Sequence, residues 1–161
     1  MSDTRTADKL RRCPLFSDLG DEACEALAPY FSELRGAEGD RLFNQGDRGA
    51  GLFVITRGTC LAIARTPEGI EKPVTSLAAP TSFGELSLLL RNERMLSVQA
   101  AGDVELLELD LDGFRKLKQA NPDLCLVLIM AIVRRFGRVV DQSGDLFQRL
   151  LFRQLEPETT T

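Results

Sequence analysis

Histidine and tryptophan are both absent from this chain of 161 residues. Without histidine, the chain has no His-ligated haem, no Ser-His-Asp catalysis and none of the usual catalytic zinc sites. The cysteines are few and widely separated, with no CxxC pair: Cys13, Cys24, Cys60 and Cys125. That spacing indicates buried or free thiols in a reducing compartment, not a disulfide framework. Since the sequence shows no nucleophile–base pair and no nucleotide-triphosphate loop, we expect no enzyme, no metal and no cofactor.

Long apolar runs are also missing, and no run approaches the ~20 residues that span a bilayer. The first five residues lack the apolar core of a signal peptide. The net charge is −4, which gives no broad attraction to nucleic acid or anionic lipid. We therefore expect a cytoplasmic protein with neither a nucleic-acid partner nor a membrane partner.

The composition that is present, 43% hydrophobic and 27% charged residues, is typical of one globular domain at this length. We predict a polar tail over 1–9, a domain over 10–140, and a helical extension with a polar tail over 141–161. Between about 31 and 110 the chain has short apolar runs separated by turn residues, and its strand candidates are 41–43, 52–55, 60–64, 74–77, 95–100 and 104–109. This spacing predicts a mainly β fold with flanking helices, built as an antiparallel roll or barrel.

Two helices follow the strands. The second is announced by Asn121 as N-cap and Pro122 in its first turn. Its apolar residues recur at steps of three and four, as in a coiled-coil seam: Ile129, Ile132, Phe136, Val139, Leu146 and Leu150. We expect a homodimer through this seam. The alternative is one long helix packed back onto its own roll, as the apolar first half, 124–133, suggests.

The segment Phe83-Gly84-Glu85-Leu86-Ser87-Leu88, followed by Arg94, brings together the groups that a small anionic sugar-phosphate requires. Backbone N–H groups at a helix start attract an anion. A guanidinium can bind two phosphate oxygens at once, and a carboxylate can accept from a ribose hydroxyl. The alternative is a Glu85–Arg94 salt bridge inside an empty roll, which would serve no function.

With helices, a strand-rich roll, an inserted short helix and a closing helix in that order, the chain resembles the cyclic nucleotide-binding domain. This is the effector module of catabolite activator proteins and of cAMP-dependent kinase regulatory subunits. The resemblance covers about 10–140 and rests on four motifs: Pro14-Leu15-Phe16, Asn44-Gln45-Gly46-Asp47, the segment 51–58, and Phe83-Gly84-Glu85-Leu86 with Arg94. It implies a double-stranded β-helix, or jelly roll, with N-terminal helices, a short phosphate-cassette helix and a long C-terminal helix.

The resemblance also implies a ligand-binding set: Gly84, Glu85, Leu86, Ser87, Arg94 and Met95. Gly84 would let the backbone approach the ligand, and Glu85 would accept the ribose 2′-OH. The N–H groups of Leu86 and Ser87 would face the cyclic phosphate or the sugar edge. Arg94 would pair with the phosphate, and the N–H of Met95 would add a donor.

Two functions remain open at this point. The first is a non-enzymatic sensor of a cyclic purine mononucleotide that signals through movement of its C-terminal helix. It would favour cAMP over cGMP, because Met95 supplies no hydroxyl for guanine. The second is a degenerate, ligand-free family member that acts as an assembly scaffold, because Met95 and Leu96 replace the small or hydroxyl residue and the alanine that usually follow the arginine. A transcription regulator would need a helix-turn-helix domain, for which 153–161 is too short, unless the chain is part of a longer protein.

Overall fold

The computed structural model describes residues 2–144. Its helices are α1 (Ser2–Arg12), η1 (Pro14–Phe16), α2 (Asp21–Leu27), η2 (Ala28–Tyr30), α3 (Glu85–Leu90), α4 (Leu111–Ala120) and α5 (Pro122–Gln142), where η marks a 3₁₀ helix. Its strands are β1 (Ser32–Gly36), β2 (Arg41–Phe43), β3 (Gly51–Arg57), β4 (Thr59–Arg65), β5 (Glu71–Ala78), β6 (Thr81–Phe83), β7 (Ser97–Ala100) and β8 (Val104–Asp110). None of these helices is both long and apolar enough to cross a membrane.

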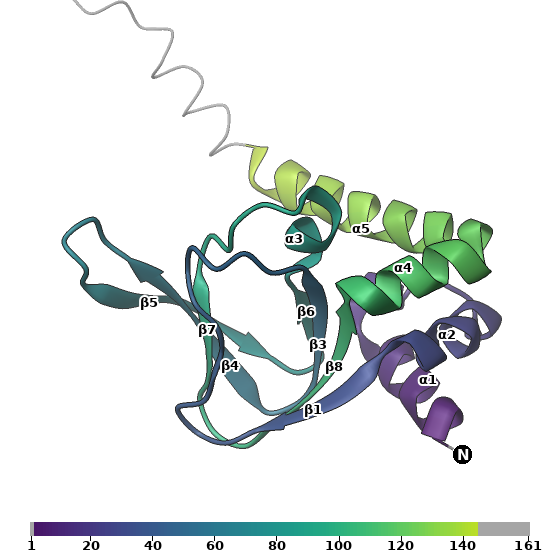
Figure 1. The fold of residues 1–161 in the computed structure, drawn as a ribbon, viewed down its shortest axis with the longest axis horizontal. Coiled ribbons are helices and arrows are strands. Elements are labelled where there is room, and N and C mark those ends of the chain that lie inside the picture. The colour runs from purple at the N-terminus through teal and green to yellow at the C-terminus, as the bar shows by residue number, and fades with distance from the viewer. Residues whose placement is uncertain (1, 145–161) are drawn as a thin grey trace, which may run out of the picture.

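The strands form two antiparallel sheets that face each other as a roll (Figure 1). One sheet has the order β1-β8-β3-β6 and the other the order β2-β7-β4-β5. The helices lie at one end of the roll, with α5 running across the top and α3 beneath it. The predicted mainly β roll with N-terminal helices, a short internal helix and a long closing helix is therefore confirmed.

Strand β3 is buried on both faces because the roll lies on one side of it and the helices on the other. Its side chains alternate between two apolar clusters, as the period of two in a strand requires. Leu52 and Val54 belong to the cluster that packs against the helices, here called the helical cluster. Phe53 and Ile55 belong to the cluster inside the roll, here called the roll cluster. β8 also contributes to both clusters: Val104 and Leu106 join the roll cluster, whereas Leu107 and Leu109 join the helical cluster.

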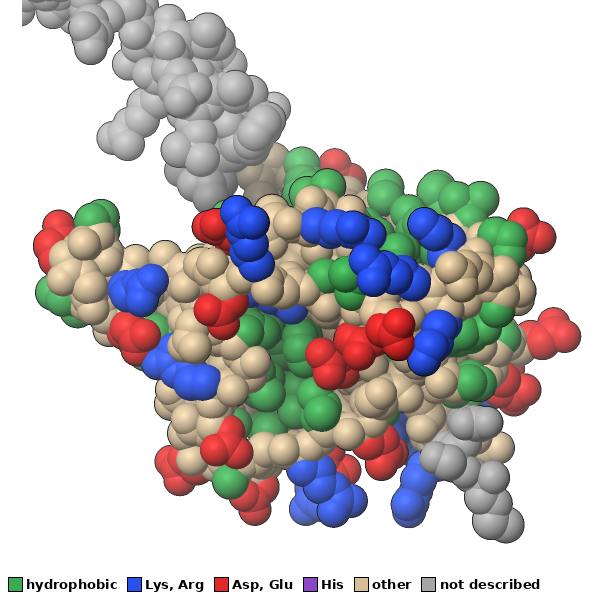
Figure 2. Space-filling model, in the orientation of Figure 1, with side chains coloured by type: hydrophobic (Ala, Val, Ile, Leu, Met, Phe, Trp, Pro, Cys, Tyr) green, Lys and Arg blue, Asp and Glu red, His purple; other side chains and the backbone are tan. Residues whose placement is uncertain are grey.

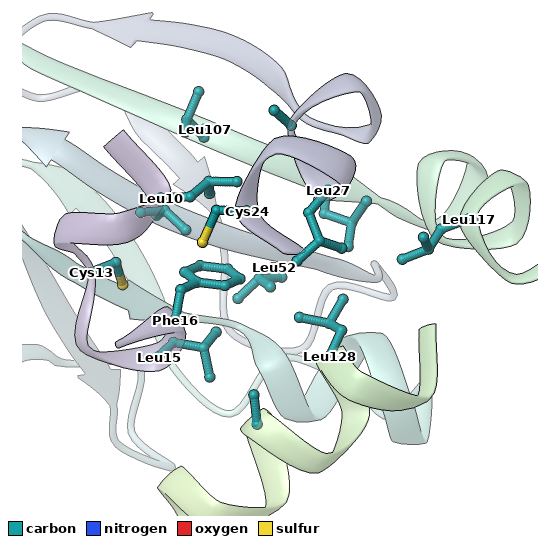
Figure 3. Close-up of a cluster of buried hydrophobic side chains, with 14 of the residues drawn as sticks. Leu10, Cys13, Leu15, Phe16, Cys24, Leu27, Leu52, Leu107, Leu117 and Leu128 are labelled. Atoms are coloured by element: carbon teal, nitrogen blue, oxygen red, sulfur yellow. The ribbon is translucent and has the colours of Figure 1, made fainter. Parts of the chain in front are cut away.

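The helical cluster joins the N-terminal helices, α4, α5 and the outer face of β3 and β8 (Figure 3). Phe16 lies at its centre and is fully buried. All four cysteines are buried and free. Three of them, Cys13, Cys24 and Cys125, belong to the helical cluster, and Cys60 belongs to the roll cluster.

The polar tail expected over 1–9 is not what the structure shows, because Ser2–Arg12 is the helix α1. Ala7 and Leu10 lie three residues apart on one face of this helix and are fully buried in the helical cluster. Two apolar residues in a polar segment are only a weak sequence signal for a helix. In the structure, α1 contacts α2 and η2, which cover its small apolar face.

Helix α5 begins as expected, with the Asn121 side chain accepting from the N–H of Leu124 at 3.1 Å. Its first half packs on its own chain. Ile132 is 2% exposed and Ile129 is partly buried in the helical cluster, so these two residues are not free to form the predicted seam. Phe136 and Val139 are half exposed. The predicted seam positions Leu146 and Leu150 lie outside the described residues, as does most of the extension predicted over 141–161.

A second stripe on α5 faces solvent and was not predicted. Leu126, Met130, Val133 and Val140 follow steps of four, three and seven, and all are exposed. In Figure 2, apolar side chains gather over α5 along the upper edge of the molecule. The stripe is therefore an exposed apolar surface of α5.

Candidate functional site

A cavity of about 260 Å³ opens between the two sheets beside α3. All six predicted site residues line it: Gly84, Glu85, Leu86, Ser87, Arg94 and Met95. The opposite wall is apolar and comes from β2, β4, β5 and β7, through Phe43, Ala62, Leu77 and Val98. Figure 2 shows apolar side chains in this opening of the roll. The volume is slightly below the range of about 300–1,000 Å³ common for small-ligand clefts.

Gly84 is the N-cap of α3 and has a φ of +84°, in the left-handed region that favours glycine. A Cβ at this position would lie 2.5 Å from the Gly51 carbonyl oxygen and 2.9 Å from Nη1 of Arg94. Because glycine has no side chain, the first amides of α3 have no side-chain cap. Among the described residues, the N–H groups of Leu86 and Ser87 have no backbone acceptor, and they stay free for a ligand.

The backbone of Arg94 is fixed by the turn that follows β2. The N–H of Arg94 donates to the carbonyl of Asp47 at 2.9 Å, and the N–H of Gly46 donates to the carbonyl of Arg94 at 2.8 Å. The Asp47 carboxylate closes the turn by accepting from the N–H of Asn44 at 2.9 Å. The Asn44-Gln45-Gly46-Asp47 motif therefore places the arginine at the cavity.

The Arg94 side chain is 6% exposed and reaches toward the start of α3. Its two terminal nitrogens donate to the Gly51 carbonyl, both at a long 3.4 Å, and its Nε has no hydrogen-bond partner in the described part of the chain. Within residues 2–144, no carboxylate forms an ion pair with it. Burial lowers the pKa of Arg94, while the nearby carboxylates of Glu108 and Asp47 act in the opposite direction. The result is a buried cation with unused donors.

Glu85 does not pair with Arg94, so the hypothesis of a Glu85–Arg94 salt bridge is wrong. The Ser82 hydroxyl donates to Oε1 of Glu85 at 3.2 Å, and Nε of Arg135 on α5 lies 3.7 Å from the same oxygen. Glu85 also lines a smaller cavity of about 120 Å³ between α3 and α5. It is thus part of the wall between the larger cavity and the long helix.

Glu93, adjacent to Arg94 in the sequence, is exposed and lies 3.9 Å from Arg48, so it does not compete for the Arg94 guanidinium. Met95 is 76% exposed and Leu96 is half-buried. Both line the cavity, but they leave it open. The backbone N–H of Met95 has no backbone acceptor among the described residues.

Several residues around Arg94 were missed by sequence reasoning. Gly49 and Gly51 border its guanidinium, because a Cβ added to either would lie 3.6–3.9 Å from its nitrogens. Phe43 lies under it, with the guanidinium carbon 4.1 Å from the ring centroid. The two glycines could have been noticed in the segment 48–51, but nothing in the sequence links a phenylalanine in a three-residue strand to an arginine 51 positions later.

The site has no group of three or more metal-ligating side chains within the described residues. It consists of a buried arginine, the free amides of a short helix, one carboxylate and an apolar wall inside a β-roll. A fold and site of this kind define a binding module for a small anionic ligand.

Comparison with known proteins is consistent with this class. A family model described as the cyclic nucleotide-binding domain matches residues 34–121, and the chain belongs to this family. The chain is 31% identical over 137 residues to the cyclic AMP receptor protein of Thermus thermophilus, covering 85% of this chain and 63% of that protein. It is 32% identical over 108 residues to a cAMP-dependent protein kinase regulatory subunit of Emericella nidulans, covering 67% of this chain and 26% of the subunit. It thus spans less than two thirds of these relatives.

Solved structures give the same result for the fold. The N-terminal domain of a transcriptional regulator from Streptomyces coelicolor A3(2) has a TM-score of 0.72 at 34% identity, covering 83% of this chain and 96% of that domain. The catabolite activator protein of Thermus thermophilus has a TM-score of 0.68 at 31% identity, covering 84% and 63% of the two chains.

Proposed function

We propose that this chain is a non-enzymatic sensor that binds a cyclic purine mononucleotide in the cavity beside α3. One observation carries the proposal: Arg94 is buried without a carboxylate partner in residues 2–144, and its Nε has no hydrogen-bond partner there. Its Nη1 lies beside Gly84 at the start of α3, where the first amides are free. A buried cation without a partner is costly unless an anion compensates it. A cyclic phosphate is an anion of the right size and charge.

The remaining groups fit the rest of the ligand. Arg94, the first amides of α3 and the N–H of Met95 supply donors for the phosphate, and each charged hydrogen bond contributes about 1.5–3 kcal/mol. Glu85 uses Oε1 for Ser82 and Arg135, which leaves its second oxygen for a ribose 2′-OH. The apolar wall can cover a purine. Met95 offers no hydroxyl to guanine, so we expect cAMP to bind more tightly than cGMP.

The signal would leave the cavity through α5. Glu85 contacts both the ligand cavity and Arg135 of α5, so occupancy of its second oxygen changes the free energy of that contact. A ligand shifts an equilibrium between two packings of α5 only through its differential affinity for them. Two relatives whose names refer to cAMP support this ligand, since they are 31% and 32% identical to the aligned parts of the chain.

We propose that two copies of the chain form a homodimer through the exposed stripe of α5, defined by Leu126, Met130, Val133 and Val140. The predicted seam residues Phe136 and Val139 are half exposed and line the smaller cavity between α3 and α5. Val133→Asp, at a residue 53% exposed, should convert a dimer to a monomer in sedimentation experiments. Val74→Asp on β5, at a residue 58% exposed, is the matched control and should leave the dimer intact. A wild-type protein that sediments as a monomer at tens of micromolar would contradict the proposal.

Isothermal titration with cAMP and cGMP tests the sensor function. Binding of cAMP should be measurable, and Arg94→Ala should weaken it by roughly tenfold or more with the fold intact. Arg48→Ala, which removes a neighbouring exposed arginine, should bind like the wild type. No heat from the wild type with either nucleotide at high micromolar concentration would favour the scaffold, for which Met95 and Leu96 are the evidence.

A further inference from the structure

We propose that Phe43 is a positioning residue for the Arg94 guanidinium, holding it ready for the phosphate before the ligand arrives. The inference rests on the proposed function, because it concerns the same cavity. Phe43 lies on β2, on the wall opposite α3, and lines the cavity. The Arg94 guanidinium carbon is 4.1 Å from the centroid of its ring and 5.7 Å from that of Phe53, so Phe43 makes the closer contact.

The Phe43 ring is itself held in place by two further rings. The Phe43 centroid lies 5.7 Å from that of Phe53 and 6.0 Å from that of Phe83, and the latter two stack 5.2 Å apart with planes 11° from parallel. Phe53 is 5% exposed and Phe83 is 9% exposed. A ring packed among buried rings has little freedom to turn, so it offers the guanidinium a fixed surface.

The other sides of the guanidinium are bordered by glycine backbone. A Cβ at Gly84 would lie 2.9 Å from Nη1, one at Gly51 would lie 3.6 Å from Nη2, and one at Gly49 would lie 3.8 Å from Nε. The planar group therefore occupies a narrow space between the Phe43 ring and three side-chain-free backbone positions. A lysine ammonium would not fill a planar space of this shape.

The contact with the Phe43 ring leaves Arg94 better able to bind a phosphate than an ion pair with a carboxylate would. A carboxylate holding the arginine would take up the N–H donors that the phosphate needs and neutralise their charge. An aromatic face attracts the cation through its quadrupole and leaves the donors at the edge of the guanidinium free. The Glu108 carboxylate lies on the same side as Gly51: a Cβ added to Gly51 would lie 3.3 Å from Oε1 of Glu108 and 3.6 Å from Nη2 of Arg94. The charge of Glu108 acts to raise the pKa of Arg94, but the two side chains form no ion pair. Phe43 thus positions the group without competing with the ligand, which reduces the cost of ordering it on binding.

A double-mutant cycle measured by titration with cAMP tests the inference. Phe43→Leu, which keeps an apolar side chain but removes the ring face, should weaken cAMP binding on the order of tenfold. In the Arg94→Gln background the same substitution should cause no further loss, because the ring acts through the guanidinium. An equal factor in both backgrounds would mean that Phe43 supports only the cavity wall, and would overturn the inference while leaving the proposed function intact.

NMR of the ligand-free protein gives a readout that does not depend on binding. The Nε–H signal of Arg94 should be shifted upfield by the ring current of Phe43 and should lose that shift in Phe43→Leu. Phe43→Met, a second ring-free variant of flexible shape, replaces Phe43→Leu if the latter does not fold. An Arg94 signal at the position of a solvent-exposed arginine in the wild type would overturn the inference. If the signal is shifted but wild-type protein binds neither cyclic nucleotide, the proposed function fails instead.

Discussion

Gly84 is the residue at which one added carbon would disturb the site most, because its Cβ would meet both the Gly51 carbonyl and Arg94. Gly84→Ala should lower the free energy of unfolding by more than the ~1–3 kcal/mol of backbone strain alone, and should abolish cAMP binding. Gly69→Ala is the matched control: Gly69 has a φ of +87°, but a Cβ there meets nothing within 4 Å. The control should show the strain without loss of affinity. Urea unfolding and titration measure the two effects, and equal destabilisation by both variants would contradict the close contact.

Glu108 gives a prediction that depends on pH. Burial, and then the charge of Asp110, raise the pKa of Glu108 above its usual value, and Arg94 opposes them only in part. The folded state therefore holds the Glu108 proton more tightly than the unfolded state does, so its ionisation lowers stability as the pH rises through the window between the two pKa values. Glu108→Gln should raise the melting temperature at pH 7, and the difference should vanish near pH 4. A variant less stable than the wild type at pH 7 would show that the attraction to Arg94 outweighs burial.

At the scale of secondary structure, the buried strands and the closing helices could be predicted, whereas α1, β1 and β6 could not. The segments 52–55, 60–64 and 104–109 appear in the sequence as apolar runs because β3, β4 and β8 are buried in the centre of the sheets. β1 (Ser32–Gly36) is largely polar and lies at a sheet edge, and β6 (Thr81–Phe83) has three residues. Their pairing comes from the tertiary fold, which overrides weak local preference.

The candidate site also has a part that could be predicted from the sequence and a part that could not. Residues near one another in the sequence, from Gly84 to Ser87, could be assigned from a local motif, and Arg94 follows closely. Phe43, Gly49 and Gly51 reach Arg94 only through the pairing of β2 with β7 and of β3 with β6. Such contacts depend on which strands pair in the sheet, and local sequence motifs do not reveal that pairing.

Asn121 gives a prediction that belongs to α5 as an element. Its side chain accepts the N–H of Leu124 and satisfies one of the free donors at the helix start. Asn121→Ala should lower the free energy of unfolding by about 0.5–2 kcal/mol. Gln119→Ala, an exposed position two residues earlier, should be close to neutral. Denaturant unfolding measures both, and indistinguishable midpoints would mean that the cap contributes nothing to stability.

For the molecule as a whole, a buried cation that has no carboxylate partner within residues 2–144 predicts strong coupling between binding and stability. Because cAMP would bind only the folded state, a concentration of 100 times its Kd should stabilise the protein by about 2.7 kcal/mol. The melting temperature should therefore rise steadily with cAMP in a thermal shift experiment. Arg94→Ala should show little of this rise at the same concentrations. A melting temperature that stays constant as cAMP is added would contradict ligand binding.

The buried thiols have a practical consequence. Burial raises the pKa of Cys13, Cys24, Cys60 and Cys125, which suppresses the reactive thiolate in the folded protein. A maleimide added to the native protein would therefore modify them only during opening events. Cys60 reports on the roll cluster and the other three on the helical cluster, so peptide mass spectrometry over a labelling time course would show whether the two halves of the molecule open together, with no engineered probe.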